Sequence, residues 1–330
     1  MLNIRSFDFK QNRLKSWLAN NLLAVVILLL VLVTLLIEPM FLSARNLTNI
    51  MLQFGPLSMV SLGMTVCIIS GYINLSVAGV FSLAAVVTFL LVDPLGQVLA
   101  ILVGLVLGCL IGGLTGGLIV SSGSFNSAQA LFMTYGISMV CEAIALIISN
   151  GATLLMSRDV SGNTSIFQAV GQGTIGIFSV SFILFIALLL ILYFVERKTY
   201  FGKALKAVGG NKKAAKLAGI SIERIIVLVF MIGGLTTAFG GITMLSRTTS
   251  AAAKMGFNYE TNAILSVVVG GTPLVGGRGS VLNTVLGTLL IILLSNCLNL
   301  LGVSTFMQNV FKGLVLVLAI WLDTRKTNRG

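Results

Sequence analysis

Long apolar runs without charge dominate this chain and restrict where it can fold. The run LLAVVILLLVLVTLLI at 22–37 is one of many, and hydrophobic residues make up 57% of the 330 residues while charged residues make up 9%. A water-soluble domain of this size could not cover its surface with so few charges. A bilayer core of about 30 Å is crossed by roughly 20 apolar residues in a helix. The sequence therefore predicts an integral membrane protein.

The same runs predict helices rather than strands. Strands of a membrane barrel alternate polar and apolar residues over about ten positions, and these runs do not alternate. We expect an all-α polytopic membrane protein with about ten transmembrane helices, in a single membrane domain over residues 1–330. The predicted spans are 22–37, 48–69, 73–92, 96–120, 128–149, 179–195, 225–246, 261–275, 281–300 and 304–322.

Basic residues predict how these helices cross the membrane. The polar segment 196–224 holds eight of the 21 basic residues. With a cytoplasmic N-terminus, ten spans place this segment, residues 1–20 and the tail 323–330 on the cytoplasmic side, as the positive-inside rule requires. The net charge of +12 is thus explained by topology, and we expect contact with membrane lipid and none with nucleic acid.

The sequence offers little covalent chemistry. It has no histidine, nine carboxylates and four cysteines without C-x-x-C spacing, which argues against a metal site or a cofactor. No nucleophile has a plausible base nearby, so we assign no catalytic residue. No G-x-x-x-x-G-K-[ST] phosphate loop occurs, so the chain should not hydrolyse ATP itself. We expect a protein that is not an enzyme.

Two glycine-rich segments interrupt the apolar runs: SGYINLSVAG at 70–79, the first break, and GGTPLVGGRGS at 270–280, the second break. Backbone that is not helical at membrane depth must be buried in protein or line a water-filled cavity. Transporters often bind substrate at such breaks, although a re-entrant turn without a binding role is the alternative. We assign the substrate pathway to Tyr72, Asn74, Ser76, Thr134, Glu142 and Thr272.

Glu142 is the only carboxylate within a predicted span. Because an ionised carboxylate is costly in the membrane, such a residue usually faces a partner or a water-filled path. It either carries a proton in a coupled transporter or fixes a neighbouring helix through a hydrogen bond or ion pair.

The basic segment has a predicted structure of its own. KALKAV and NKKAAKLAGI are rich in helix formers and are separated by Gly209 and Gly210, so we expect two short helices joined at a bend. Asn211 is placed to cap the second helix, and Gly219 to close it. Charged helices of this kind can rest on anionic lipid, but the small alanine face is better suited to a groove in a protein.

Three motifs together resemble a known family. TYFGKALKAVGGNKKAAKLAGISIER is similar to the cytoplasmic segment of bacterial ABC-transporter permeases of the ribose/galactose type, GGTPLVGGRGSVLNTVLG to their late glycine-rich motif, and SGYINLSVAG to the signature after their second helix. The likeness runs from about residue 20 to 322. It implies a type II, vitamin-B12-importer-like permease fold in the bacterial inner membrane.

The resemblance also implies partners and a mechanism. Two permease subunits, as a homodimer or a heterodimer, would pair with two ATP-binding subunits, and an extracytoplasmic binding protein would deliver a monosaccharide. The cytoplasmic bend would dock in a groove of the ATP-binding subunit. The coupling residues implied in this sequence are Gly202, Ala207, Gly209, Gly210, Asn211, Lys212, Lys213, Ala214, Ala215 and Gly219.

Departures from the family pattern leave the substrate open. Asn74 stands where members usually carry Asp, and Glu142 lies where they carry Arg. The same machine could therefore carry nucleosides, autoinducer-type signals or branched-chain amino acids. An ion-coupled secondary carrier and a non-transporting membrane scaffold are the alternatives from other classes.

Overall fold

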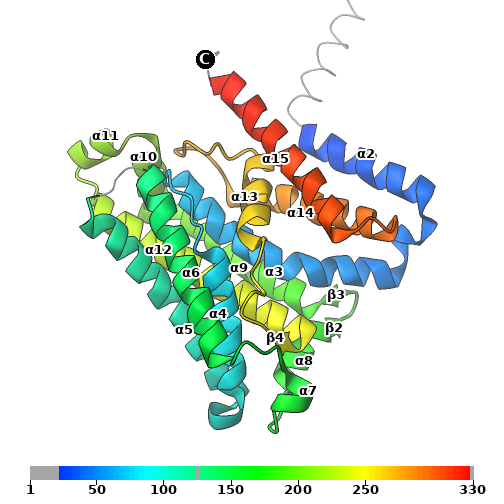
Figure 1. Cartoon of the computed structure of the whole chain (residues 1–330). Helices are drawn as coiled ribbons and strands as arrows, with labels where there is room; N and C mark the ends of the chain where they lie inside the picture. The colour runs from blue at the N-terminus through cyan, green and yellow to red at the C-terminus, as the bar shows by residue number, and fades with distance from the viewer. Residues whose placement is uncertain (1–21, 124–126, 328–330) are drawn as a thin grey trace, which may run out of the picture.

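The computed structural model describes residues 22–123 and 127–327 (Figure 1). The predicted cytoplasmic N-terminus, residues 1–20, and the last three residues of the predicted tail lie outside the described residues. The long helices are α2 (Leu22–Ile37), α3 (Ala44–Ile69), α4 (Val77–Leu90), α5 (Val92–Ser121), α6 (Ser127–Ile148), α9 (Val180–Lys198), α12 (Ile222–Thr248), α13 (Tyr259–Val269), α14 (Val281–Leu300) and α15 (Thr305–Thr327).

The remaining elements are short. The helical ones are η1 (Pro39–Leu42), α7 (Met156–Asp159), α8 (Ser165–Gln172), α10 (Tyr200–Gly210) and α11 (Lys212–Leu217). The strands are β1 (Leu154–Leu155), β2 (Thr174–Ile175), β3 (Phe178–Ser179) and β4 (Ser250–Ala251). They form two antiparallel pairs, β1 with β4 and β2 with β3.

The prediction of an all-α polytopic membrane protein is confirmed. In the described part of the chain, six helices are long and apolar enough to cross a membrane, and α2, α4 and α15 contain shorter apolar helices. Large apolar side chains such as Leu114 and Ile147 are 66% and 74% exposed. Such faces suit lipid, because a soluble protein rarely leaves contiguous apolar surface in water.

Helices α3 and α12 form the centre of the molecule. In α3, 89% of the most apolar 18-residue window is buried, and in α12 the share is 67%. The α3 helix begins at a capped turn, where the Ser43 hydroxyl accepts a hydrogen bond from the Asn46 N–H at 3.3 Å. Elements on either side of α3 and α12 are therefore positioned against a packed core.

The glycines of α5 allow close helix packing. A Cβ at Gly112 would collide with the carbonyl of Phe230 on α12, and a Cβ at Gly108 would lie 2.7 Å from the Gly234 oxygen. Glycines four residues apart lie on one helical face and let another backbone approach. These glycines therefore form the face of α5 that packs against α12.

The two ends of the molecule carry different elements. In the view of Figure 1, α10, α11 and the C-terminal end of α15 all lie in the upper part of the molecule, and α7, α8 and the β2–β3 hairpin lie lower down. Residues of the 150–178 connection are fastened to the start of α5. The Asp93 carboxylate accepts from the N–H of Gly162 at 2.9 Å, and Gln97 Oε1 accepts from the N–H of Ile166 at 2.7 Å.

Several helix boundaries differ from the predicted spans because residues 70–76 and 270–280 belong to neither neighbouring helix. The α4 helix begins at Val77 rather than at 73, and α13 ends at Val269 rather than at 275. The α5 helix contains a kink at Gly96, where φ is 75°. Each break contains glycine with a positive φ, such as Gly71 in the first and Gly276 in the second.

Candidate functional site

Three segments far apart in the sequence meet at one point, which we call the glycine junction: residues 69–72, 209–210 and 276–277. The N–H of Gly277 donates to the carbonyl of Ile69 at 2.8 Å. A Cβ at Gly209 would collide with that same carbonyl and lie 2.6 Å from the Gly277 nitrogen. A Cβ at Gly276 would lie 2.7 Å from the Gly71 nitrogen. Backbone therefore touches backbone here, and only glycine fits.

The basic segment folds as two short helices, as predicted. Thr199 caps α10 by accepting from the Gly202 N–H at 3.4 Å, and Asn211 caps α11 by accepting from the Ala214 N–H at 3.0 Å. Gly219 follows α11 with φ 78°. The bend lies at Asn211, where φ is −158° and ψ is 104°. Gly209 and Gly210 belong to the last turn of α10, one residue earlier than the bend.

The C-terminal end of α11 is a complete Schellman motif. The N–H of Ile220 donates to the Ala215 carbonyl at 3.1 Å, and the N–H of Gly219 donates to the Lys216 carbonyl at 3.0 Å. These are the two bonds that define the motif, and the left-handed residue between them is usually glycine. The cap predicted for Gly219 is therefore observed, and it fixes the direction in which the chain enters α12.

The predicted coupling residues divide by exposure. Gly202 and Ala215 are buried against the body of the protein, and Ala207, Gly209 and Lys212 are partly buried. The exposed ones are Gly210, Asn211, Lys213, Ala214 and Gly219. The alanine face is divided in the same way, since Ala204 packs inside and Ala218 is exposed. One side of the segment thus holds it in place, and the other side is open.

Lys212 connects this segment to the first break. Its Nζ lies 4.1 Å from the centroid of the Tyr72 ring, within the range of a cation–π contact. Burial against this surface lowers the pKa of Lys212 below its usual value. Tyr72 is fully buried, contacts the Phe230 ring on α12 at 6.0 Å, and has a hydroxyl without a partner among the described residues.

Polar side chains satisfy the backbone of the first break. Asn74 Oδ1 accepts from the N–H of Ser76 at 3.0 Å and from its hydroxyl at 2.6 Å. The Thr134 hydroxyl on α6 accepts from the N–H of Leu75 at 3.0 Å. Four of the predicted pathway residues, Tyr72, Asn74, Ser76 and Thr134, are therefore buried together. Their present contacts are structural, and their role in a substrate path stays a prediction.

Three serines that the sequence reasoning missed complete this arrangement. The Ser127 hydroxyl donates to the Gly71 carbonyl at 2.7 Å, the Ser138 hydroxyl accepts from the Gly79 N–H at 2.9 Å, and the Ser82 hydroxyl accepts from the Gly256 N–H at 2.9 Å. Their hydroxyls replace water for backbone that helices leave unpaired. No local pattern marks such serines, because their partners are distant in sequence.

The other two predicted pathway residues lie apart. Thr272 is 1% exposed in the second break, and its hydroxyl has no partner among the described residues. Glu142 is partly buried on α6, two turns beyond Thr134.

A third carboxylate ties the basic segment to the second break. Glu196 is 6% exposed, accepts from Lys206 Nζ at 2.8 Å and accepts from the Val281 N–H at 3.0 Å. Val281 is the first residue of α14, so the carboxylate also lies at the positive end of a helix dipole. Sequence reasoning counted Glu196 only as the start of a charged segment and missed this clamp between α9, α10 and α14.

The junction can transmit motion but carries no evident covalent chemistry. Among the described residues, no three metal-ligating side chains gather. The described contacts instead join an exposed basic surface, the end of α3 and both breaks through short backbone contacts. An external force applied to α10 and α11 would therefore reach both breaks without passing through a flexible side chain.

Comparison with known proteins shows which sequences this chain resembles. Residues 46–320 match the family model described as branched-chain amino acid transport system / permease component. The ribose import permease protein of Bacillus subtilis (strain 168) is 38% identical over 300 residues, 91% of each chain. Its counterpart in Escherichia coli (strain K12) is 32% identical over 94% of this chain and 96% of that protein.

Another relative imports a different sugar. The galactose/methyl galactoside import permease protein of Escherichia coli (strain K12) is 30% identical over 92% of this chain and 94% of that protein. No solved structure matches the chain. The family model spans most of the sequence, including all three segments of the glycine junction, and the relatives are similar over nearly their whole lengths. This chain therefore belongs to the family of permease components of branched-chain amino acid transport systems.

Proposed function

We propose that this chain is the membrane-spanning permease subunit of an ATP-binding-cassette importer and carries a monosaccharide such as ribose or galactose. The observation that carries the proposal is the glycine junction, where Gly209 of the basic segment touches Ile69 and Gly277 at the two breaks. Relatives that import ribose and galactose support the substrate class. The chain contributes the membrane path, and its energy comes from separate subunits that hydrolyse ATP.

The exposed part of the basic segment is the proposed docking surface for an ATP-binding subunit. Lys213 and Ala214 lie outside on α11, next to the exposed Gly210 and Asn211. Small residues allow a groove to close over the bend, and the lysine adds charge at its edge. Gly202 and Ala215, which are buried against the body of the protein, hold the segment in its position. ATP-driven closure of the partner would shift the segment as a rigid body.

The complete importer contains more than this chain. We propose two ATP-binding subunits, a second permease subunit, identical or different, and an extracytoplasmic binding protein that delivers the sugar. Ten transmembrane helices in a type II permease fold would place both termini in the cytoplasm of a bacterium, with the chain in its inner membrane. The common position of α10, α11 and the end of α15 at one end of the molecule supports this orientation (Figure 1).

Co-purification tests the docking surface. The variants Lys213→Glu and Ala214→Trp change exposed side chains of α11, so they should leave the fold intact and lose the ATP-binding subunit. Lys254→Glu is the matched control, because Lys254 is equally exposed but lies between α12 and α13, far from α11 in the chain. If both α11 variants retained the ATP-binding subunit, this surface would be excluded as its docking site.

Uptake tests the energy source. Membrane vesicles with the permease, its ATP-binding subunits and the binding protein should accumulate the sugar only when ATP is present on the side of the ATP-binding subunits. Omission of the ATP-binding subunits should abolish uptake. Sugar accumulation that persists without them, driven by an ion gradient, would favour a secondary carrier and contradict the proposal.

A further inference from the structure

A polar cavity of about 250 Å³ lies between α3, α12, α13, α14 and α15. Its lining includes the amides of Gln53, Asn262, Asn299 and Gln308 and the cations of Arg247 and Lys312. A water molecule occupies about 30 Å³ in the liquid, so the cavity has room for a small solute. Polar lining of this density is unusual between apolar helices, because burying polar groups without partners is costly.

Several of these polar groups have unused hydrogen-bonding capacity. Gln308 Nε2 donates to Asn299 Oδ1 at 3.2 Å and to the Val303 carbonyl at 3.0 Å. By contrast, the side-chain amides of Gln53 and Asn262 have no hydrogen-bond partner among the described residues. Each amide can donate and accept. Both are therefore free to bind hydroxyl groups of a solute.

The charge in the cavity is unbalanced. Arg247 and Lys312 line it and no carboxylate does. Neither forms an ion pair among the described residues, where the salt bridges are Arg158–Asp159 and Lys206–Glu196. Glu260 lies on the same helix as Asn262, but it does not line the cavity. Cations within a membrane protein usually pair with an opposite charge or mark a substrate path.

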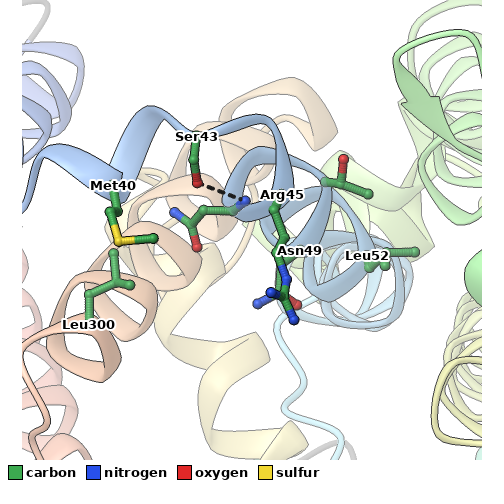
Figure 2. A pocket seen from close by; sticks show the side chains of 8 residues that line it. Met40, Ser43, Arg45, Asn49, Leu52 and Leu300 are labelled. Atoms are coloured by element: carbon green, nitrogen blue, oxygen red, sulfur yellow. Dashed lines mark hydrogen bonds between the residues drawn. The ribbon is translucent and has the colours of Figure 1, made fainter.

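A second hollow is a groove of about 650 Å³ at the start of α3. Arg45 and Asn49 extend together from the helix there, while Met40 faces Leu300 (Figure 2). Arg45 is the one charged side chain that lines the groove among the described residues, and no carboxylate lines it.

A pair of buried amides fixes the start of α3 against α14. Asn46 Nδ2 donates to Asn296 Oδ1 at 3.0 Å, and Asn296 Nδ2 donates to Asn46 Oδ1 at 2.9 Å. This reciprocal amide pair holds the start of α3 to α14, and both residues are buried. A solute in the cavity thus meets donors on rigid helices, which is the arrangement that a selective site requires.

We propose that the cavity is a solute-binding subsite for a small polyhydroxylated acid, a sugar acid rather than a neutral sugar. Its hydroxyls would bind the amides of Gln53 and Asn262, and its carboxylate would accept charge-assisted hydrogen bonds from Lys312 and Arg247. The inference rests on the proposed function, because it assumes that a solute enters this chain. It extends the proposed substrates from neutral monosaccharides, such as those named for the relatives, to sugar acids.

Ligand-detected saturation-transfer NMR tests the proposal with the full-length chain in lipid nanodiscs. The matched probes are the open-chain polyol ribitol and D-ribonate, which differ only at the terminal carbon that bears the carboxylate in ribonate. Ribonate should bind at least about tenfold more tightly, because a hydrogen bond to a charged group contributes about 1.5–3 kcal/mol. Equal or tighter binding of ribitol, or binding of neither probe, would overturn the proposal.

Two variants locate the binding. Lys312→Met should lower ribonate binding about tenfold and leave ribitol binding unchanged. Asn262→Asp is nearly isosteric and adds the missing negative charge, so it should remove the preference for ribonate while the protein stays folded. Lys254→Met is the control, since Lys254 is exposed and does not line the cavity. If all three variants bound ribonate equally well, the assignment of ribonate binding to this cavity would be wrong.

The result of this binding test can be distinguished from the results that test the proposed function. Binding in nanodiscs needs neither ATP nor an ATP-binding subunit, so a failed co-purification would not remove it. If the ATP-binding subunit co-purifies and ribose transport proceeds while ribonate never binds, the importer stands and the acid-binding site is wrong.

Discussion

The Lys212 ammonium lies 4.1 Å from the centroid of the Tyr72 ring, and this pair joins the surface segment to the first glycine break. Lys212 is the first residue of α11, whereas Tyr72 is fully buried beside Phe230. A side chain that reaches from a docking surface onto a buried aromatic ring stabilises one position of that surface relative to the membrane helices.

Loss of the lysine charge should weaken this position. Lys212→Met keeps a long apolar side chain but removes the cation–π contact, which contributes about 0.5–1 kcal/mol at a partly exposed site. We expect ATP hydrolysis to continue with less sugar carried per ATP. Tyr72→Phe keeps the ring and removes a hydroxyl without a described partner, so it should behave like the parent. Measured ratios of uptake to hydrolysis that are equal in both variants would contradict this role.

Substitution at the junction should be severe. A Cβ in Gly209→Ala would collide with the Ile69 carbonyl, and overpacking of this kind costs about 1–3 kcal/mol. Gly117→Ala is the matched control in α5, since nothing lies within 4 Å of a Cβ there. The control should gain about 0.5–1 kcal/mol from helix propensity. Thermal unfolding in detergent compares the two, and equal melting temperatures would argue against tight packing at Gly209.

The Glu196 clamp predicts coupling between two substitutions. Glu196→Ala should cost about 1–3 kcal/mol, because Lys206 Nζ and the Val281 N–H lose their acceptor. Lys206→Met alone leaves the buried carboxylate with one partner fewer and should also destabilise. The double variant Glu196→Ala with Lys206→Met removes both charges and should lose less stability than the two single variants added together. Additive losses in a double-mutant cycle would show that the two residues act independently.

Acid should loosen the 150–178 connection through Asp159. Hydrogen bonds from Arg158 and from the Leu155 N–H lower the pKa of Asp159. Because the pKa of Asp159 is lower in the folded protein than in the unfolded one, its carboxylate stabilises the loop at any pH above the unfolded pKa of about 3.9. This contribution is lost as the pH falls through the folded pKa. Amide exchange at Leu155 should therefore rise in acid relative to Asp159→Asn at the same pH. A constant ratio between the two proteins would exclude this dependence.

Much of the helical arrangement could be predicted from local sequence. Apolar length alone places the cores of α3, α5, α12 and α14, and the cap at Asn211 follows from a short polar side chain before helix formers. The predicted helix boundaries were wrong where polar residues next to a helix were counted as part of it. Val77 rather than residue 73 begins α4, because Asn74 and Ser76 use their polar atoms to stabilise the turn before it.

The contacts of the site could not be predicted because they depend on how helices align in space. Thr134 and Ser138 hold the first break from α6, yet both read as ordinary hydroxyls within an apolar helix. Gly209 was assigned to a bend, but its required neighbour is Ile69, far away in the chain. The cavity at Asn262 gathers side chains from five helices, so no single stretch of sequence contains its pattern.

The glycine junction also determines how stiff the connection between surface and membrane is. Side chains between two moving parts absorb displacement by changing rotamer, but at Gly209 and Gly277 there is no side chain to do so. The mechanical compliance of this connection is therefore that of the peptide backbone itself. A small displacement of the docking surface must either be transferred in full to the ends of both breaks or separate the three segments.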